Sequence, residues 1–370
     1  MSRIRIIYTI PNFDTAGSGI ALMKMALRLD KSQFEPMIVC LHDKGKYFEE
    51  VRASGIPVHI FPYLSDLTPR MALMKNVIRT AKFFRSLRPD IIFSYHYAPN
   101  ISEVLAARLA GCKFMYVKKN MGWKGGSYNQ WRIRTYLSNA ITVQNTDMMR
   151  NFFPGNPMAR LISIGVDQEE YFPTSVDLDL KNELNIAVGK KVVLCVANLI
   201  PKKGIEFLIR GFAASDLRTT AKLVIVGNND TPMRVGMDEL IAGLGMGEDV
   251  LFTGKRNDVP RFYSIADLFI LPSTGDEGAP IAIQEAMASG VPVITTDTPG
   301  NRDQLKDLPG QLIPPSDAIA IARIIDRYLS LDDHERKRII NTQLKIVEDR
   351  YSLKEEVRQH EALYRELTKR

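Results

Sequence analysis

Short apolar runs alternate with segments of helical periodicity along this 370-residue chain. The alternation is typical of βα units, in which each strand of a parallel sheet is followed by a helix. In the first half it predicts strands at residues 3–10, 34–41, 58–61, 90–95, 114–118 and 140–144, and helices at 20–29, 45–54, 70–87, 99–110, 128–138 and from about 147. In the second half it predicts strands at 191–197, 222–226, 250–253, 268–271, 293–295 and 311–313, and helices at 204–215, 232–244, 258–265, 280–289, 316–330 and 332–349, with a final helix ending near 368.

The length of the chain predicts two domains, because single hydrophobic cores stop growing at about 250–300 residues. We expect a first domain over residues 1–170 and a second over residues 171–350, with an acidic interdomain linker at 168–185. In α/β sheets of this kind ligands bind outside the carboxyl ends of the strands. A ligand site is therefore expected where the two sheets present those ends.

The segment most informative about function lies between two strands of the second half and reads DEGAPIAIQEAMASG over residues 276–290. Pro280 fits the first position of a helix, and Gly290 fits the position just past its end. The free backbone N–H groups at the start of this helix can bind an anion. Glu277 precedes the helix and Glu285 lies within it, leaning back towards its start. Acids beside an anion site suit a ligand that carries both hydroxyls and phosphates, as a sugar nucleotide does.

A structural interpretation of this acidic pair stays open. Glu277 could complement the helix dipole, and Glu285 could belong to a solvated face. The helix is apolar almost all round, however, so we expect Glu285 to point into a lined cleft.

Charge is divided unevenly along the chain. Residues 1–170 contain 23 Lys and Arg against 13 Asp and Glu, whereas residues 171–370 contain 26 against 29. A basic first half indicates an anionic partner such as a membrane surface or a lipid phosphate, and plain solubility is the alternative. Nucleic acid is not expected as a partner, because no recognition motif accompanies the charge.

The remaining composition predicts a cytoplasmic protein, with peripheral association with the inner face of the cytoplasmic membrane. Residues 1–10 form a strand pattern rather than a signal peptide, and no apolar run approaches the ~20 residues that span a bilayer. Cys40, Cys112 and Cys195 are predicted to be buried free thiols. No His/Cys spacing suggests zinc, and neither a metal nor a cofactor is expected.

Five second-half segments occur in the order that characterises one family. They read VANLIPKKG from Val196, LVIVG from Leu223, VLFTG from Val250, DVP followed by YSIAD from Asp258, and finally the segment with Glu277 and Glu285. The chain resembles the retaining glycosyltransferases of family 4 over essentially its whole length. The resemblance implies an α/β fold of GT-B architecture, with two Rossmann-like βα domains facing each other across a cleft. It further implies an acceptor-side first domain, a nucleotide-sugar-binding second domain, and a C-terminal helix (about 351–370) packing back on the first domain.

The resemblance also implies roles for residues of the second domain. Glu285 would hold the nucleotide ribose, and Glu277 would face the donor sugar as a catalytic group. Lys203 would neutralise the leaving diphosphate without a metal, although an exposed lysine beside a helix cap is the alternative. Further donor contacts are implied for Gly278, Ala279, Pro280, Ile281, Asn198, Lys202, Gly227, Gly254, Lys255 and Arg256.

Several positions depart from the family pattern. Many members have Arg where this chain has Asn198, so one charged contact to the diphosphate would be either missing or supplied by Lys202. The glycine loop of the first domain reads Gly17-Ser18-Gly19, with Ser18 between glycines that are usually adjacent.

The first domain contributes further candidates after two of its strands. Lys119 and Asn120 stand where many members have a His, and they are candidates for contacts to donor sugar or phosphate. His96 ends a strand and is a candidate contact, although a lone His is more often structural. Asp177-Leu178-Asp179 resembles the metal-binding motif of another glycosyltransferase fold, but it lies in the predicted linker and is interpreted as solvated.

The predicted function is transfer of a hexosyl group from a UDP- or GDP-sugar to a hydroxyl of a cell-surface glycan or lipid-linked acceptor, with retention of the anomeric configuration. One alternative is a sugar-nucleotide epimerase of GT-B-like architecture, and another is a non-catalytic nucleotide-sugar-binding subunit. An oxidoreductase is not favoured, because no Gly-x-Gly-x-x-Gly follows any predicted strand.

Overall fold

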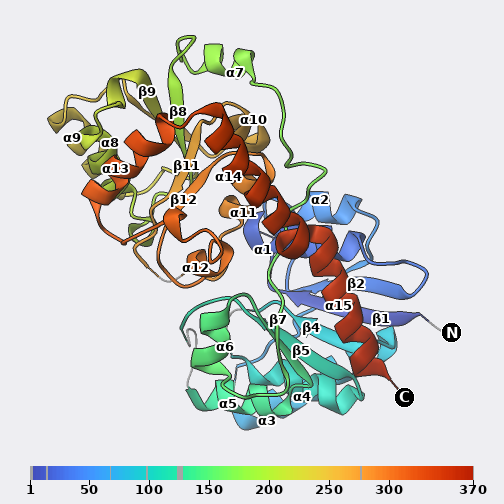
Figure 1. Cartoon of the computed structure of the whole chain (residues 1–370). Coiled ribbons are helices and arrows are strands. Elements are labelled where there is room, and N and C mark those ends of the chain that lie inside the picture. Colours follow the sequence, from blue (N-terminus) through green and yellow to red (C-terminus); the bar gives the residue numbers. More distant parts are fainter. Residues whose placement is uncertain are drawn as a thin grey trace. The chain divides into compact units, whose positions relative to one another are not determined.

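The computed structural model describes residues 3–13, 16–66, 68–96, 99–122, 128–275 and 277–369, with residues 16–18 described as backbone only. The chain divides into two compact units, coloured along the sequence in Figure 1. Unit 1 comprises residues 1–164 and 353–370, and unit 2 comprises residues 165–352. The chain therefore enters unit 2 near residue 165, slightly before the predicted boundary at 170/171.

Unit 1 is built on a parallel sheet in the order β3-β2-β1-β4-β5-β6-β7. The strands are β1 (Ile4–Ile10), β2 (Phe34–Cys40), β3 (Val58–Ile60), β4 (Ile91–Ser94), β5 (Lys113–Lys118), β6 (Ala140–Val143) and β7 (Ala159–Leu161). Six of these strands were predicted from their apolar runs. The seventh, β7, was missed because it has three residues, of which only Ala159 is buried.

Two helical layers cover the two faces of this sheet. The helices α1 (Ala16–Leu27), α2 (Phe48–Ala53) and α15 (Leu353–Thr368) contribute to one buried apolar cluster. The helices α3 (Arg70–Leu87), α4 (Ile101–Ala110), α5 (Tyr128–Leu137) and α6 (Thr146–Phe152) contribute to the other, and Figure 1 shows them along one side of the sheet.

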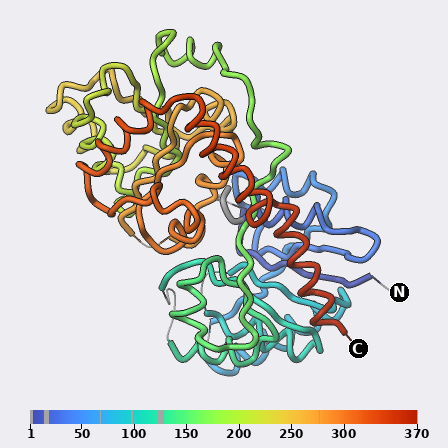
Figure 2. Tube along the Cα trace, viewed as in Figure 1, coloured from blue at the N-terminus to red at the C-terminus, as the bar shows by residue number. Residues whose placement is uncertain are grey.

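The last helix of the chain is an integral part of unit 1. Figure 2 shows the red C-terminal segment lying beside the blue N-terminal strand. The hydroxyl groups of Tyr8 on β1 and Tyr364 on α15 are 3.0 Å apart, and both side chains are fully buried. Burial raises the pKa of Tyr364 well above its ordinary value, so this phenol stays protonated.

Unit 2 repeats the architecture with a six-stranded parallel sheet in the order β10-β9-β8-β11-β12-β13. Its strands are β8 (Lys191–Val196), β9 (Ala221–Val226), β10 (Val250–Gly254), β11 (Leu268–Leu271), β12 (Val293–Thr296) and β13 (Leu312–Ile313). Its longer helices are α8 (Ile205–Ala214), α9 (Met233–Gly243), α10 (Val259–Ser264), α11 (Ile281–Ala288), α13 (Ala318–Leu329) and α14 (Asp333–Ile346). The predicted fold class of two Rossmann-like α/β domains is confirmed.

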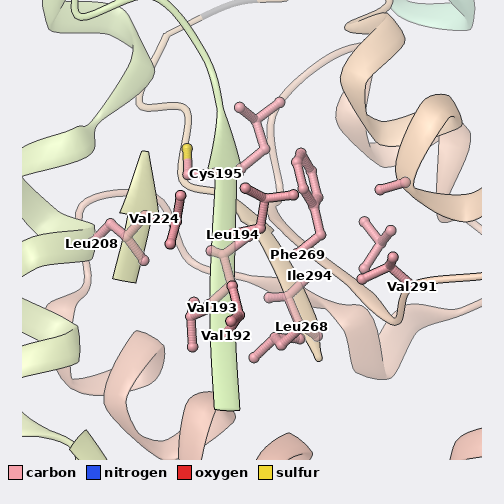
Figure 3. Packing of buried hydrophobic residues seen from close by; sticks show 14 of the residues in the cluster. Val192, Val193, Leu194, Cys195, Leu208, Val224, Leu268, Phe269, Val291 and Ile294 are labelled. Carbon is pink, nitrogen blue, oxygen red and sulfur yellow. The ribbon is translucent and has the colours of Figure 1, made fainter. Parts of the chain in front are cut away.

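The core of unit 2 consists of near-continuous apolar strands, as a sheet covered on both faces requires. Val192, Val193 and Leu194 of β8 are fully buried, and Figure 3 shows them packed beside Val224 of β9 and Leu268 of β11. These central strands carry the loops that form the candidate site. The short helix α12 (Asn301–Gln304), which follows β12, was not predicted.

The prediction that residues 168–185 form a solvated interdomain linker is wrong. It contains helix α7 (Leu178–Glu183), and Leu180 is fully buried in the core of unit 2. Asp177 caps this helix by accepting a hydrogen bond from the Leu180 N–H, 2.7 Å away. Its carboxylate also pairs with Arg261 at 2.7 Å, and this contact lowers the pKa of Asp177. The Asp-Leu-Asp sequence is therefore a helix cap rather than an exposed acidic turn.

The predicted glycine loop of the first domain is also corrected. Gly17, Ser18 and Gly19 lie within α1, which begins at Ala16 rather than near residue 20. A Cβ atom at residue 19 would come within 2.7 Å of the Phe13 ring. Close packing of the helix on Phe13 therefore accounts for Gly19.

Two further expectations concern the described residues. Cys40, Cys112 and Cys195 are free and buried, as predicted. None of the described helices is both long and apolar enough to cross a membrane.

Candidate active site

The candidate site of unit 2 lies where its strand order changes direction. Strands β8 and β11 are neighbours, but β8 leads to β9 on one side and β11 leads to β12 on the other. The loops that leave the carboxyl ends of two such strands diverge, and the crevice between them is the usual ligand position in α/β sheets. Both loops here contain residues selected from the sequence.

The two loops are fastened together by backbone contacts. The N–H groups of Thr274 and Gly275, after β11, donate to the Lys202 carbonyl at 2.9 and 3.3 Å. Gly204 has φ of 63°, and a Cβ atom there would lie 2.1 Å from the Pro272 carbonyl oxygen. Glycine at residue 204 is therefore required both by the backbone conformation and by the close approach of the loops. This contact places Lys202 and Lys203 beside the loop that carries Glu277.

Glu277 is held by two lysines and a serine. Its Oε1 atom lies 2.9 Å from Lys203 Nζ and accepts a hydrogen bond from Ser273 Oγ at 3.2 Å, and its Oε2 atom lies 3.4 Å from Lys202 Nζ. The Glu277 side chain is 7% exposed, against 16% for Lys203 and 48% for Lys202. A buried carboxylate needs such partners. Two cations around one anion leave an excess positive charge that faces partly into solvent.

The loop between Glu277 and α11 leaves the helix start without a side-chain cap in the described structure. Pro280 is the residue before the helix, with φ of −67° and ψ of 115°, rather than its first residue as predicted; Ile281 is the first. Gly290 follows the helix with φ of 75°, as expected for a C-terminal glycine. Gly300 (φ 84°) packs against this loop, since a Cβ atom there would lie 2.3 Å from the Gly278 carbonyl oxygen.

Glu285 is positioned by two buried tyrosines. The Tyr263 hydroxyl donates to Glu285 Oε2 at 2.9 Å, and Tyr171 also forms a hydrogen bond with the Glu285 side chain. Burial raises the pKa of Tyr263 well above its ordinary value, and the charge of Glu285 adds to the shift. Both tyrosines therefore remain protonated donors, which fix the orientation of the carboxylate on the half-buried face of α11.

A second group of predicted residues gathers at the carboxyl ends of β8, β9 and β10. Asn198 Oδ1 accepts from the Asn228 N–H at 3.0 Å, and the Gly227 N–H donates to the Gly254 carbonyl at 3.0 Å. A Cβ atom at Gly227 would lie 2.2 Å from the Ala197 carbonyl oxygen, so the loops after β8 and β9 meet at that glycine. The exposed Lys255 follows Gly254.

Arg256 is engaged in an ion-pair network rather than left available to a ligand. Its guanidinium makes a two-pronged contact with Asp258, with both distances at 2.8 Å, and reaches Glu183 of α7 at 2.9 Å. These contacts lower the pKa of Asp258 to about 2. The network ties α7 to the start of α10.

Sequence reasoning missed several residues of this site. Tyr171 and Tyr263 orient Glu285, Ser273 contacts Glu277, and Gly300 supports the loop. Asn301, fully buried, donates to Thr295 Oγ1 at 2.7 Å beside that loop. The Pro299-Gly300-Asn301 turn after a buried strand was the signal available for the last two, whereas nothing local marks the tyrosines as partners of Glu285.

The candidates of the first domain lie in unit 1, after β4 and β5. Lys119 places its ammonium 4.2 Å from the centre of the Tyr95 ring. Burial lowers the pKa of Lys119 to about 7, against an opposing influence of Glu356. With Gln144 and His360, these residues line a cavity of about 30 Å³ at the carboxyl edge of the sheet.

Lys118 and His96 flank this edge. Lys118 Nζ donates to the carbonyl oxygens of Asn120 and Gly122, the latter at 2.6 Å, and burial lowers the pKa of Lys118 to about 8. Lys118 therefore shapes the backbone of the loop that contains Asn120. The His96 N–H lies 3.5 Å from Ser94 Oγ.

Unit 1 has its own change of strand direction, between β1 and β4. There Arg134 of α5 and Glu103 of α4 form an ion pair at 3.4 Å with both side chains fully buried. Ser94 Oγ donates to Glu103 at 2.7 Å, and Thr9 Oγ1 donates to the other oxygen of the same carboxylate. Burial raises the pKa of Glu103 and lowers that of Arg134, and each charge opposes the shift of the other.

The described residues contain no group of three or more His, Cys, Asp or Glu side chains arranged to hold a metal ion. The positive charge beside Glu277 is supplied by lysines.

Comparisons with known proteins agree with this geometry. Residues 177–345 match the family model described as glycosyl transferases group 1, and residues 15–169 match that described as Glycosyltransferase Family 4. The chain is 24% identical over 307 residues to the Campylobacter jejuni N,N'-diacetylbacillosaminyl-diphospho-undecaprenol alpha-1,3-N-acetylgalactosaminyltransferase, covering 77% of this chain and 79% of the relative. These models and relatives are transferases, so the epimerase alternative is not favoured.

Solved structures show the same fold. A glycosyltransferase from Rickettsia africae matches with a TM-score of 0.87 at 20% identity, over 100% of both chains. Anabaena HepE, crystallised with UDP and glucose, matches with a TM-score of 0.80 at 20% identity, over 98% of this chain and 99% of that one. The two family models together account for most of both units, and the chain is a glycosyltransferase of group 1, family 4, with the GT-B fold.

Proposed function

We propose that the enzyme transfers a hexosyl group from a UDP- or GDP-sugar to a hydroxyl of a lipid-linked or cell-surface glycan, with retention of the anomeric configuration. The observation that carries the proposal is the pairing of Glu277 with Lys202 and Lys203 at the start of α11. Glu285 lies on the same helix and supplies a second oriented carboxylate. Anabaena HepE, which has the same fold, was crystallised with UDP and glucose.

The donor diphosphate would compete with Glu277 for the two lysines. A diphosphate carries more negative charge than one carboxylate, and phosphate forms strong charge-assisted hydrogen bonds with ammonium groups. The uncapped N–H groups at the start of α11 add to the attraction. Once the lysines turn to the phosphate, the Glu277 oxygens can accept hydrogen bonds from sugar hydroxyls. Glu285, held by Tyr263 and Tyr171, would accept those of the ribose.

The transfer step would take place on one face of the sugar. The acceptor oxygen forms a bond to the anomeric carbon while the bond from that carbon to the diphosphate oxygen breaks. The proton of the acceptor hydroxyl passes to the departing diphosphate, so no separate base is required. Lys203, the more buried of the two lysines, stabilises the negative charge that develops on the leaving group.

The acceptor side of the reaction is assigned to unit 1. The named Campylobacter relative acts on a diphospho-undecaprenol-linked substrate, and the first 170 residues of this chain are strongly basic. Lys119, which lines the small cavity at the carboxyl edge of the sheet of unit 1, and the adjacent Asn120 are proposed to contact the donor sugar or a phosphate.

Peripheral contact with an anionic membrane is part of the proposal. Helix α3 carries five basic residues and no acidic residue, and its Met71, Met74 and Ile78 side chains are exposed by 86%, 57% and 44%. Cations beside exposed apolar side chains suit an anionic lipid surface, where each Lys or Arg contributes about 1 kcal/mol. We call this surface of α3 the cationic face. Attachment there would keep the enzyme at the cytoplasmic side of the membrane that holds its acceptor.

Calorimetric titration with UDP, GDP and their sugars tests the donor assignment. We expect one of the two diphosphates to bind, and Glu277→Gln to depress turnover more than donor affinity, because this change retains the shape of the side chain but removes its charge. Absence of binding by every nucleotide would contradict the proposed donor class. Isomerised sugar without release of nucleotide would instead indicate an epimerase.

Vesicle sedimentation tests the membrane contact. The enzyme is expected to sediment with vesicles that contain phosphatidylglycerol at low salt and to be released at high salt. Met71→Ser combined with Lys75→Gln should weaken this binding. Equal sedimentation with purely zwitterionic vesicles would contradict an electrostatic contact.

A further inference from the structure

A groove on unit 1 lies between α5, the end of α6 and the segment that follows α6. Its volume is about 760 Å³. Its walls are mainly apolar and include Tyr128, Ile133, Tyr136, Phe152, Phe153 and Met158. Tyr136 is 82% exposed and Tyr128 60% exposed. Large exposed aromatic side chains around an apolar hollow mark a binding surface more often than a plain solvated face.

The groove also carries charge of one sign only among its described lining residues. Among the described residues that line it, the charged side chain is that of Arg132, which is exposed. Polar contacts are offered by Asn129 and Asn156. An apolar groove with a cation and amides at its rim complements a ligand in which a hydrocarbon chain is attached to an anionic group.

The aromatic side chains that line the groove also contact the lysine that supports the loop after β5, residues 119–122. Lys118 Nζ lies 4.4 Å from the centre of the Phe152 ring and 5.4 Å from that of Trp131, and both aromatic side chains line the groove. The same ammonium donates to the carbonyl oxygens of Asn120 and Gly122. A ligand that presses on these rings would therefore contact the support of the loop that contains Lys119 and Asn120.

We propose that this groove binds the first units of an isoprenoid chain attached to a phosphate, the lipid part of the acceptor. The inference rests on the proposed function, because a chain held here would bring a lipid-linked sugar to the carboxyl edge of the sheet of unit 1. Arg132 would pair with the phosphate of the lipid, while Ile133, Tyr136 and Phe152 contact the hydrocarbon. The groove thereby favours acceptors that carry a lipid over free glycans.

The test uses the full chain saturated with whichever of UDP and GDP binds it, so that the lysines of unit 2 are occupied and do not bind the probe. Farnesyl diphosphate, geranyl diphosphate and inorganic pyrophosphate are titrated by calorimetry. Farnesyl diphosphate is expected to bind roughly tenfold more tightly than geranyl diphosphate, because one more isoprene unit is partly buried. Inorganic pyrophosphate is expected not to bind. Equal affinity for all three would overturn the proposal, since only the anionic group would then be recognised.

Matched variants locate the site. Ile133→Asp places a charge in the groove at a position that is 44% exposed, and Ile319→Asp makes the same change at a 55% exposed position of α13 in unit 2. The first is expected to weaken farnesyl diphosphate binding at least tenfold and the second to leave it unchanged. Tyr136→Ser, at a still more exposed position, should weaken it without affecting folding. Unchanged binding in both groove variants would contradict the assignment.

A second copy of the chain is the competing occupant of the groove. If Ile133→Asp abolished a concentration-dependent dimer and left farnesyl diphosphate affinity intact, the groove would be an interface between two copies, and the lipid assignment would be overturned. Failure of both UDP and GDP to bind the unmodified protein would instead contradict the proposed donor site. The Ile133→Asp and Ile319→Asp titrations would still decide the role of the groove.

Discussion

Each unit places acid–base pairs where its strand order changes direction, but the two arrangements differ in solvent access. In unit 1, Glu103 and Arg134 are both fully buried, and Ser94 and Thr9 satisfy the carboxylate further. In unit 2, the buried Glu277 is paired with Lys203, which is 16% exposed, and Lys202, which is 48% exposed. The pair in unit 1 is sealed within its own network, whereas the cations in unit 2 can exchange partners with a ligand.

The difference in burial leads us to interpret the charges of unit 1 as structural and those of unit 2 as functional. A sealed pair gains from low dielectric and full hydrogen bonding, but no ligand can reach it. A carboxylate that shares two accessible lysines holds them in place until a more highly charged anion arrives. Removal of the cation that pairs with the carboxylate is therefore expected to lower stability in unit 1, and to lower catalytic activity rather than stability in unit 2.

The largest effect is expected from the sealed pair. Arg134→Met leaves Glu103 buried without its cation, and the free energy of unfolding should fall by about 3–5 kcal/mol. Affinity for the nucleoside diphosphate should not change, because the proposed donor site lies in unit 2. Denaturant unfolding and calorimetry measure the two quantities. Arg132→Met, an exposed neighbour on α5, is the control and should change stability by less than about 0.5 kcal/mol.

Lys203→Ala should affect catalysis rather than folding. Loss of the less exposed of the two lysines, the proposed partner of the leaving group, is expected to lower kcat by about 10²–10³-fold. Lys202→Ala, which removes the more exposed lysine, serves as the comparison and should lower kcat less. Steady-state kinetics on released nucleotide measure both. Equal effects of the two substitutions would mean that the unequal burial of Lys202 and Lys203 has no bearing on catalysis.

Glu285→Ala should weaken binding of the nucleoside diphosphate by about 10–100-fold, the value of hydrogen bonds to a charged group. Tyr263→Phe removes one of the donors that orient Glu285 and should have a smaller effect. Calorimetric titration distinguishes the two variants. Unchanged affinity in Glu285→Ala would show that the carboxylate does not hold the ribose.

The pH dependence of stability in unit 1 depends on a second buried charge, that of Lys119. Burial lowers the pKa of Lys119 to about 7 in the folded protein, against about 10.4 in the unfolded chain. Between these pH values the unfolded chain binds the extra proton, so the free energy of unfolding should rise with pH. The penalty is fully present below pH 7 and disappears above the unfolded pKa.

Lys119→Met should remove the part of this rise that Lys119 contributes, whereas Lys118, whose pKa burial lowers to about 8, still contributes its own. The difference in the free energy of unfolding between the variant and the unmodified protein should shrink as the pH increases from 7 to 10. Unfolding measured at a series of pH values tests the sign. Tyr95, Glu356 and His360 surround Lys119, and burial lowers the pKa of His360 to about 3, so His360 contributes no titration in this range. A difference independent of pH would contradict the assignment of a depressed lysine pKa.

Much of the fold could be predicted because its signals are local. Continuous apolar runs such as residues 191–196 and 268–271 indicate strands buried on both faces, and their alternation with helices indicates parallel sheets. The predictions that failed depended on contacts between distant segments. The segment that contains helix α7 looked like a linker because it is acidic. Its Asp177 and Glu183 are paired with Arg261 and Arg256, which lie elsewhere in the chain.

The candidate site follows the same division. The spacing of Glu277 and Glu285 on predicted elements indicated these two residues, and the family resemblance indicated Lys203. The structure brings Glu277 and Lys203 into contact. Nothing in the sequence indicated that Tyr171 and Tyr263 orient Glu285. Their contacts with Glu285 depend on the packing of α10 and α11 with the segment that contains Tyr171, which lies 92 residues before Tyr263. The family resemblance implied Arg256 as a donor contact, and in the structure its guanidinium forms ion pairs with Glu183 and Asp258.

A structure determined in complex with UDP-glucose or GDP-mannose tests the central claim most directly. We expect the diphosphate to lie at the start of α11, with a phosphate oxygen within hydrogen-bond distance of Lys203 Nζ and ribose hydroxyls on Glu285. A structure in which Lys203 still pairs with Glu277 while the diphosphate binds elsewhere would contradict it.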